Sequence, residues 1–148
     1  MPISGLHHAV LSVPDLEAAE SYYRELLDMG VLFREGTLSG TYGKVPDGVD
    51  WAVAKAHGVE PGMSFLRRDD FVLALAADPE TSEPTRFDHL ALEIDLADLG
   101  SLASRAAEMG CGVSERETSV VVTDRYGVEW ELSAEGFPPS CPFEELDL

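Results

Sequence analysis

GLHHAVLSVPD, residues 5–15, decides the fold, because residues 87–95, FDHLALEID, repeat its pattern about eighty residues later. Alternate side chains of a strand point to opposite faces, so His8 and His89 each lie on the face opposite a run of apolar residues. A strand with one apolar face against a helix turns its other face to solvent or to a cavity. Two such strands favour a shared cavity with one histidine from each half.

Each strand is followed by apolar residues at helical spacing. Asp15 is a suitable N-cap for the first helix, and Gly30 supplies its C-terminal stop. Gly110 ends the second helix at the same offset, and the two helix ends read DMG and EMG. The apolar faces comprise Leu16, Ala19, Tyr22, Tyr23, Leu26 and Leu27 in the first copy, and Leu96, Leu99, Leu102, Ala103, Ala106 and Ala107 in the second. The chain therefore contains two copies of one supersecondary unit.

Further strands complete each copy. The first copy continues with VLFREG, MSFLRR and FVLALAA, interrupted by the Gly-rich SGTYG and a short helix near VDWAVAKAH. The second continues with CGVSER, SVVVTD and VEWELSA without an interrupting helix. We expect an α+β fold in which each unit runs strand, helix and then strands.

Composition sets the broad class of protein. A chain of 148 residues that is 45% hydrophobic fits one globular domain. The formal net charge of −18 repels phosphate backbones and anionic membranes, so we expect no nucleic acid and no membrane partner. Cys111 and Cys141 lack CxxC spacing, which argues against a disulfide framework or zinc ribbon but leaves one bridge open. With neither a secretory signal nor a long apolar run, we expect a cytoplasmic protein.

The last strand offers a carboxylate for the same cavity. In VEWELS, Glu131 shares its face with Glu129, opposite Trp130 and Leu132. Two imidazoles and one carboxylate form the facial triad that holds Fe(II) in many oxygenases, and the set can also hold zinc, nickel, manganese or cobalt. Alternatively, the histidines are half-exposed sheet residues without a metal. We expect His7 to point away from His8 or into solvent.

Three stretches resemble the vicinal oxygen chelate superfamily, the glyoxalase, bleomycin-resistance and extradiol-dioxygenase group. They are HAVLSVPDLEAAESYYRELLDMG, DHLALEIDLADLGSLASRAAEMG and DRYGVEWEL, and together they span nearly the whole chain. Met29 stands where the family usually has leucine. In the last stretch Asp124, Gly127, Glu131 and Leu132 match the family pattern, while Arg125, Tyr126 and Val128 depart from it.

The resemblance implies a single domain over residues 1–148, built from two βαβββ modules whose curved mixed sheets enclose a metal-binding cleft. The modules would cover about residues 1–78 and about 87–135, with a linker at about 79–86 and a tail at 136–148. Carried over from the family, the metal ligands are His8, His89 and Glu131.

The residue at the position of a fourth metal ligand indicates which members of the superfamily the chain resembles more. Ala74 aligns with Glu131 and stands where glyoxalase I has a glutamate or glutamine, so the set resembles that of the extradiol dioxygenases more closely. Val121 replaces a tyrosine of those enzymes, which also usually have four modules.

These features predict a divalent-metal-dependent enzyme that binds a small substrate through vicinal oxygens. Dioxygenase chemistry on Fe(II) is favoured, with lyase, isomerase or epimerase chemistry on the same site as the alternative. A second alternative is a metal-free drug-binding resistance protein, for which the charge of −18 would suit a cationic ligand. Because members of the superfamily often dimerise, we expect a homodimer.

Four further residues are candidates for roles around the substrate. Tyr126, Glu129 and His57 carry the groups that acid and base catalysis uses. Trp51, in the insertion of the first copy, is a candidate for lining a substrate pocket. Their alternative roles are a turn residue, a solvent-facing strand residue, a helix-end cation and a core residue, respectively.

Overall fold

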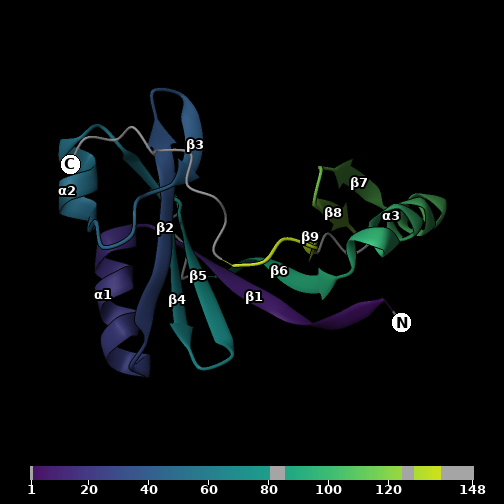
Figure 1. Cartoon of the computed structure of the whole chain (residues 1–148), viewed down its shortest axis with the longest axis horizontal. Coiled ribbons are helices and arrows are strands. Elements are labelled where there is room, and N and C mark those ends of the chain that lie inside the picture. The colour runs from purple at the N-terminus through teal and green to yellow at the C-terminus, as the bar shows by residue number, and fades with distance from the viewer. Residues whose placement is uncertain (1, 81–85, 125–128, 138–148) are drawn as a thin grey trace. The chain divides into compact units, whose positions relative to one another are not determined.

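The computed structural model describes residues 2–80, 86–124 and 129–137. The described residues form two compact units. The first unit contains residues up to Val10 and those between Phe87 and Phe137, and the second contains those between Leu11 and Arg86. Strand β1 (Ile3–Val13) therefore contributes residues to both units. Figure 1 labels the elements of each unit.

The first unit pairs the start of the chain with its second half. Its elements after β1 are β6 (Arg86–Ile94), a 3-10 turn (Leu96–Asp98), α3 (Leu99–Glu108), β7 (Gly112–Glu115), β8 (Ser119–Thr123) and β9 (Glu129–Ser133). Their strand order is β1-β6-β9-β8-β7. Strands β6 and β9 are parallel, whereas β8 is antiparallel to both β7 and β9. The sheet is thus mixed, as the family resemblance implied.

Helix α3 covers one face of this sheet (Figure 1). Helix and sheet share a core cluster of buried residues, which are Ile94, Leu99, Ala103, Ala106, Val120, Val122 and Leu132. Alternation along the strands then directs the odd-numbered residues of β6 and β9 to the opposite face. That second face carries His89 and Glu131.

The second unit contains the rest of the first copy. Its elements are α1 (Leu16–Leu27), β2 (Gly30–Leu38), β3 (Thr41–Lys44), α2 (Trp51–Ala56), β4 (Glu60–Arg68) and β5 (Phe71–Ala77). The strand order is β3-β2-β4-β5-β1, and α1 packs against β4 and β5 (Figure 1). Asp15 caps α1 as predicted, because its carboxylate accepts a hydrogen bond from the Ala18 N–H at 3.1 Å.

A buried polar cluster ties α1 to the strands of the second unit. The guanidinium of Arg34 donates from Nε and Nη2 to the two oxygens of Glu20, at 3.0 and 2.5 Å. Ser64 Oγ donates to Glu20 Oε2 at 2.6 Å and accepts from Trp51 Nε1 at 2.9 Å. Burial alone would raise the pKa of Glu20, but the hydrogen bonds from Arg34 and Ser64 and the arginine charges outweigh it and lower the pKa. We conclude that Glu20 is an ionised anchor for α1, β2, β4 and α2.

Three local predictions for the first copy were wrong. The first helix ends at Leu27, and Asp28, with φ of 51°, takes the left-handed conformation expected of Gly30. Aspartate tolerates this conformation, and the Asp28 N–H bonds to the Arg24 carbonyl. The predicted apolar face is also only partly buried, since Tyr22 is 58% exposed. The SGTYG stretch, predicted as a break, contributes residues to strand β3.

Among the described residues, no helix has the length and apolar character required to cross a membrane. Cys111 is a free thiol, and Cys141 lies outside the described residues.

Candidate metal centre

His8, His89 and Glu131 come together in the first unit from three strands, β1, β6 and β9. Each offers one ligand atom, and these atoms lie within 4.8 Å of one another. His89 Nε2 is 3.0 Å from Glu131 Oε2, and His8 Nε2 is 3.7 Å from the same oxygen. The structure therefore brings together the three residues that the family motifs assign as ligands.

Strand register explains how His89 and Glu131 meet. In the parallel β6–β9 pair, Ala91 is the partner of Glu131, and His89 lies two residues earlier on the same face as Ala91. Diagonal neighbours of this kind are about 7–8 Å apart at the backbone, a distance that long side chains span. Ala91 is fully buried and carries only a methyl group, which leaves room for the two larger side chains to converge.

His8 is held neutral by its surroundings. Burial lowers its pKa to about 4, with further lowering by His7 and His89 against an opposing contribution from the Glu131 charge. At pH 7 the imidazole of His8 is therefore unprotonated on one nitrogen. This is the form that coordinates metal ions.

His89 and Glu131 stabilise each other's charged forms. Burial would lower the pKa of His89, but hydrogen bonds and charges from Glu131 and Asp88 outweigh it and raise the pKa. Burial would raise the pKa of Glu131, yet the His89 hydrogen bond and the charges of the nearby histidines lower it. Glu131 is thus a carboxylate, the form that binds cations.

The donor set fits a divalent transition metal. Two imidazole nitrogens and one carboxylate oxygen are suited to iron, zinc, nickel, manganese or cobalt. Val121 lies directly opposite Glu131 in the β8–β9 pair, so an apolar side chain borders the carboxylate where the extradiol enzymes have tyrosine. In the second unit, Ala74 is fully buried in β5 opposite Phe65 and offers no ligand atom.

The expectation for His7 was wrong. Its side chain is only 8% exposed, and its Nδ1 lies 2.7 Å from His8 Nδ1. Its ring also packs on Phe137, with centroids 4.2 Å apart. His7, Asp88 and Phe137 are contacts of the site that sequence reasoning missed, although HH and DH pairs at equivalent places of the two copies were a visible signal.

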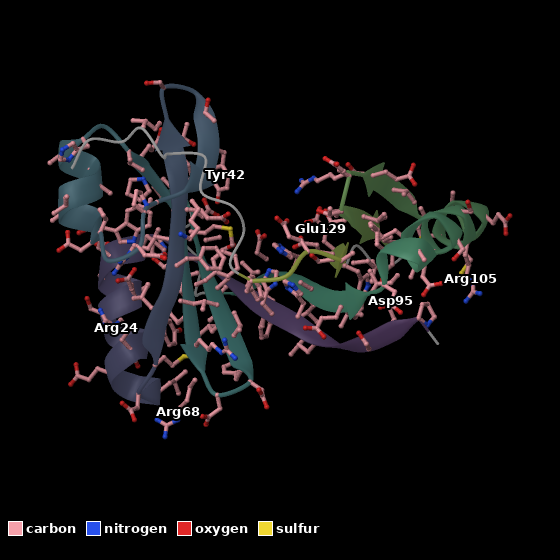
Figure 2. The ribbon with its side chains drawn as sticks, viewed as in Figure 1. Arg24, Tyr42, Arg68, Asp95, Arg105 and Glu129 are labelled. Carbon is pink, nitrogen blue, oxygen red and sulfur yellow. The ribbon has the colours of Figure 1, made fainter. Side chains whose placement is uncertain are left out.

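Of the other candidate residues, the structure describes Glu129, His57 and Trp51, each within its own unit. Glu129 begins β9 and is exposed (Figure 2). His57, exposed in the second unit, caps α2, and its ring Nδ1–H donates to the Val53 carbonyl at 3.0 Å. Trp51 is 3% exposed in the same unit and has the contacts of a packed core residue. Tyr126 lies outside the described residues.

Residues 5–137 match the family model described as Glyoxalase/Bleomycin resistance protein/Dioxygenase superfamily. The comparison with curated proteins found no match. Similar solved structures include methylmalonyl-CoA epimerase from Mycobacterium tuberculosis, at 18% identity and a TM-score of 0.59 over 89% of this chain and 88% of that one.

Two dioxygenases are also similar in fold. Homoprotocatechuate 2,3-dioxygenase from Arthrobacter globiformis has 15% identity and a TM-score of 0.62, over 97% of this chain and 39% of that one. The 2,3-dioxygenase LapB from a Pseudomonas species has 19% identity and a TM-score of 0.58, over 94% and 43%. The chain spans less than half of each dioxygenase, and at these identities the similarity shows a shared fold.

Proposed function

Because the chain belongs to the Glyoxalase/Bleomycin resistance protein/Dioxygenase superfamily, we propose that it is a divalent-metal-dependent enzyme acting on a small substrate with adjacent oxygens. The observation that carries this proposal is the convergence of the ligand atoms of His8, His89 and Glu131 within 4.8 Å. A protein that only binds a drug has no need of this donor set at the family's ligand positions.

In this proposal His8 and His89 supply imidazole nitrogens and Glu131 supplies a carboxylate oxygen to the ion. When bound, the ion acts as a Lewis acid that withdraws charge from substrate oxygens. One carboxylate neutralises only half of a divalent charge, so the loaded centre would retain a positive charge that attracts an anionic substrate.

The chain's own residues prepare the site for such a substrate. Burial keeps His8 neutral, and hydrogen bonding keeps Glu131 ionised, so both are in the forms that bind a cation. Val121 is the cross-strand partner of Glu131, and the ring centroid of Phe137 lies 5.7 Å from that of His8, so apolar side chains neighbour two of the three candidate ligands. Electrostatic interactions are stronger in such surroundings than in bulk water.

Fe(II)-dependent dioxygenase chemistry is the reaction type we favour. The support is the donor set itself, two histidines and one carboxylate, together with alanine at the position where glyoxalase I has a fourth ligand. Fe(II) would supply redox chemistry with dioxygen, which zinc does not.

Epimerase, lyase or isomerase chemistry is the second candidate. It is supported by the similarity in fold to methylmalonyl-CoA epimerase, which extends over 88% of that protein, whereas the similarity to the two dioxygenases extends over 39% and 43% of them. Such chemistry needs a proton acceptor near the substrate, for which Glu129, His57 and Tyr126 stay predictions.

We also propose that the protein is a homodimer, to be tested by light scattering at several concentrations.

The test of the enzyme proposal is metal binding. Elemental analysis of purified protein and titration with Co²⁺ should give about one ion per chain, and His8→Ala and Glu131→Ala should each abolish it. His57→Ala, which changes an exposed histidine in the other unit, is the matched control and should bind normally. Wild-type protein that takes up no Co²⁺, Zn²⁺ or Fe²⁺ would favour the metal-free drug-binding alternative.

A second experiment separates the two reaction types. Oxygen consumption with a panel of catechols would indicate a dioxygenase, whereas racemisation of thioester substrates would indicate an epimerase.

A further inference from the structure

We propose that His7 is a positioning residue of the candidate metal centre, which fixes the tautomer and orientation of His8 through a hydrogen bond between their Nδ1 atoms. The inference rests on the proposed function in one respect, namely that His8 is a metal ligand. The hydrogen-bond arrangement itself follows from the structure of the first unit.

The backbone carbonyl of Glu135, just after β9, is a hydrogen-bond partner of His7. His7 Nε2 lies 2.8 Å from this oxygen. A carbonyl oxygen only accepts hydrogen bonds, so the proton of this contact must be on His7 Nε2. The backbone after β9 therefore determines which nitrogen of His7 carries hydrogen.

The tautomer of His8 follows from that of His7. In a neutral imidazole with hydrogen on Nε2, the other nitrogen is an acceptor. His7 Nδ1 thus accepts, and His8 Nδ1, 2.7 Å away, must donate. The lone pair of His8 is then on Nε2, the nitrogen 3.7 Å from Glu131 Oε2 and in the ligand cluster.

Burial protects the hydrogen bonds between Glu135 and His7 and between His7 and His8, here called the hydrogen-bond relay, from competition by water. His7 is 8% exposed and His8 is 5% exposed, so water competes little for their nitrogens. Phe137 packs on both rings, with centroids 4.2 Å from His7 and 5.7 Å from His8. The segment after β9 thereby contributes both the carbonyl anchor and an apolar cover to the same pair of histidines.

The second copy repeats the arrangement with a different partner. Asp88 directly precedes His89, as His7 precedes His8, and Asp88 Oδ2 lies 2.7 Å from His89 Nδ1. Both ligand histidines are therefore held at Nδ1 by the preceding side chain and present Nε2 towards Glu131. A carboxylate increases the basicity of the imidazole it binds more than a neutral imidazole does. His8, whose partner is His7, should therefore bind a metal ion more weakly than His89, whose partner is Asp88.

Three substitutions at position 7 separate the parts of this arrangement. His7→Asn keeps an acceptor oxygen near the position of Nδ1 but loses the contact to Glu135. His7→Gln keeps a donor near the position of Nε2 but removes the acceptor for His8. His7→Phe removes both polar atoms while keeping a ring against Phe137, so it controls for packing.

The first readout needs no metal. Nitrogen NMR of the protein labelled with ¹⁵N-histidine should show His8 with hydrogen on Nδ1 in the wild type and in His7→Asn. In His7→Phe and His7→Gln, this tautomer should be lost. A purely structural role for His7 would lower stability without this change, so thermal unfolding is measured beside it. Wild-type His8 with hydrogen on Nε2, or an unchanged tautomer in a folded His7→Phe protein, would overturn the inference.

The second readout is Co²⁺ affinity by titration. His7→Phe and His7→Gln should bind Co²⁺ about 10–100-fold more weakly than wild type, with His7→Asn in between, as is usual for partners of ligand histidines. Equal affinities within twofold across all variants would contradict the positioning role. If the wild type binds no metal while the His8 tautomer depends on His7, the proposed function fails and the hydrogen-bond relay is supported.

Discussion

Ala91 on β6 lies directly opposite Glu131 on β9, and its fully buried methyl group is on the sheet face that also carries His89 and Glu131. A larger side chain at this position would occupy the space into which the two ligands project. The small residue is therefore as much a part of the candidate centre as the residues with ligand atoms.

Ala91→Leu should separate His89 from Glu131 and weaken Co²⁺ binding by at least tenfold. Overpacking of a filled site also costs about 1–3 kcal/mol of unfolding free energy. Ala97→Leu, in the exposed 3-10 turn after β6, is the matched control and should change neither quantity. Titration with Co²⁺ and urea unfolding measure the two effects, and normal Co²⁺ affinity in folded Ala91→Leu would contradict the assignment.

Asp88→Ala removes the hydrogen-bond acceptor of His89 Nδ1 and should lower Co²⁺ affinity about 10–100-fold. Asp88→Asn keeps an acceptor oxygen without the charge, so its loss should be smaller. Asp95→Ala is the control, since Asp95 is exposed and directly follows the end of β6 (Figure 2). An effect of Asp95→Ala as large as that of Asp88→Ala would indicate a general loss of negative charge.

The Glu20 cluster predicts a large effect on stability. Glu20→Gln removes the charge partner of Arg34, which is 11% exposed, and should lower the free energy of unfolding by about 3 kcal/mol. Glu17→Gln breaks the pair with Lys55, whose side chains are 43% and 51% exposed, and should cost less than about 1 kcal/mol. Urea unfolding at pH 7 compares them. Equal costs would mean that the buried network contributes no more than a surface ion pair.

The same carboxylate predicts a pH dependence. Because the folded-state pKa of Glu20 is below its ordinary value of 4.5, its contribution is complete above pH 4.5 and decreases as pH falls through the lower, folded-state pKa. The stability difference between wild type and Glu20→Gln should therefore shrink with acidification below pH 4.5 and stay constant from pH 6 to 8. A difference that grows on acidification would show that the pKa is raised instead.

The sequence predicted the α+β class and the family resemblance implied the mixed sheet, and the structure confirms both. The resemblance also assigned His8, His89 and Glu131 as metal ligands, and that role stays a prediction. Alternation along β6 and β9 is regular, so the apolar residues on one face correctly indicated that His89 and Glu131 share the other face. It failed at His7 because residues 7–10 of β1 are all buried. Where both faces of a strand are covered, alternation no longer separates a solvent side from a core side.

The ends of elements were less predictable for a different reason. Gly30 is the better helix terminator by intrinsic preference, yet Asp28 takes the left-handed position, two residues earlier, and Gly30 begins β2. The Ala91 and Val121 neighbours of Glu131 depend on strand register. Register is determined by pairing across the sheet, which a single sequence does not encode locally.

The central claim is that His8, His89 and Glu131 hold one divalent ion. Its most direct test is a crystal of the protein loaded with Co²⁺ or Fe²⁺, with anomalous scattering recorded above and below the absorption edge of the metal. We predict a single strong anomalous peak within coordination distance of His8 Nε2, His89 Nε2 and a Glu131 oxygen. A loaded crystal with no peak there, or with its peak at other side chains, would contradict the claim.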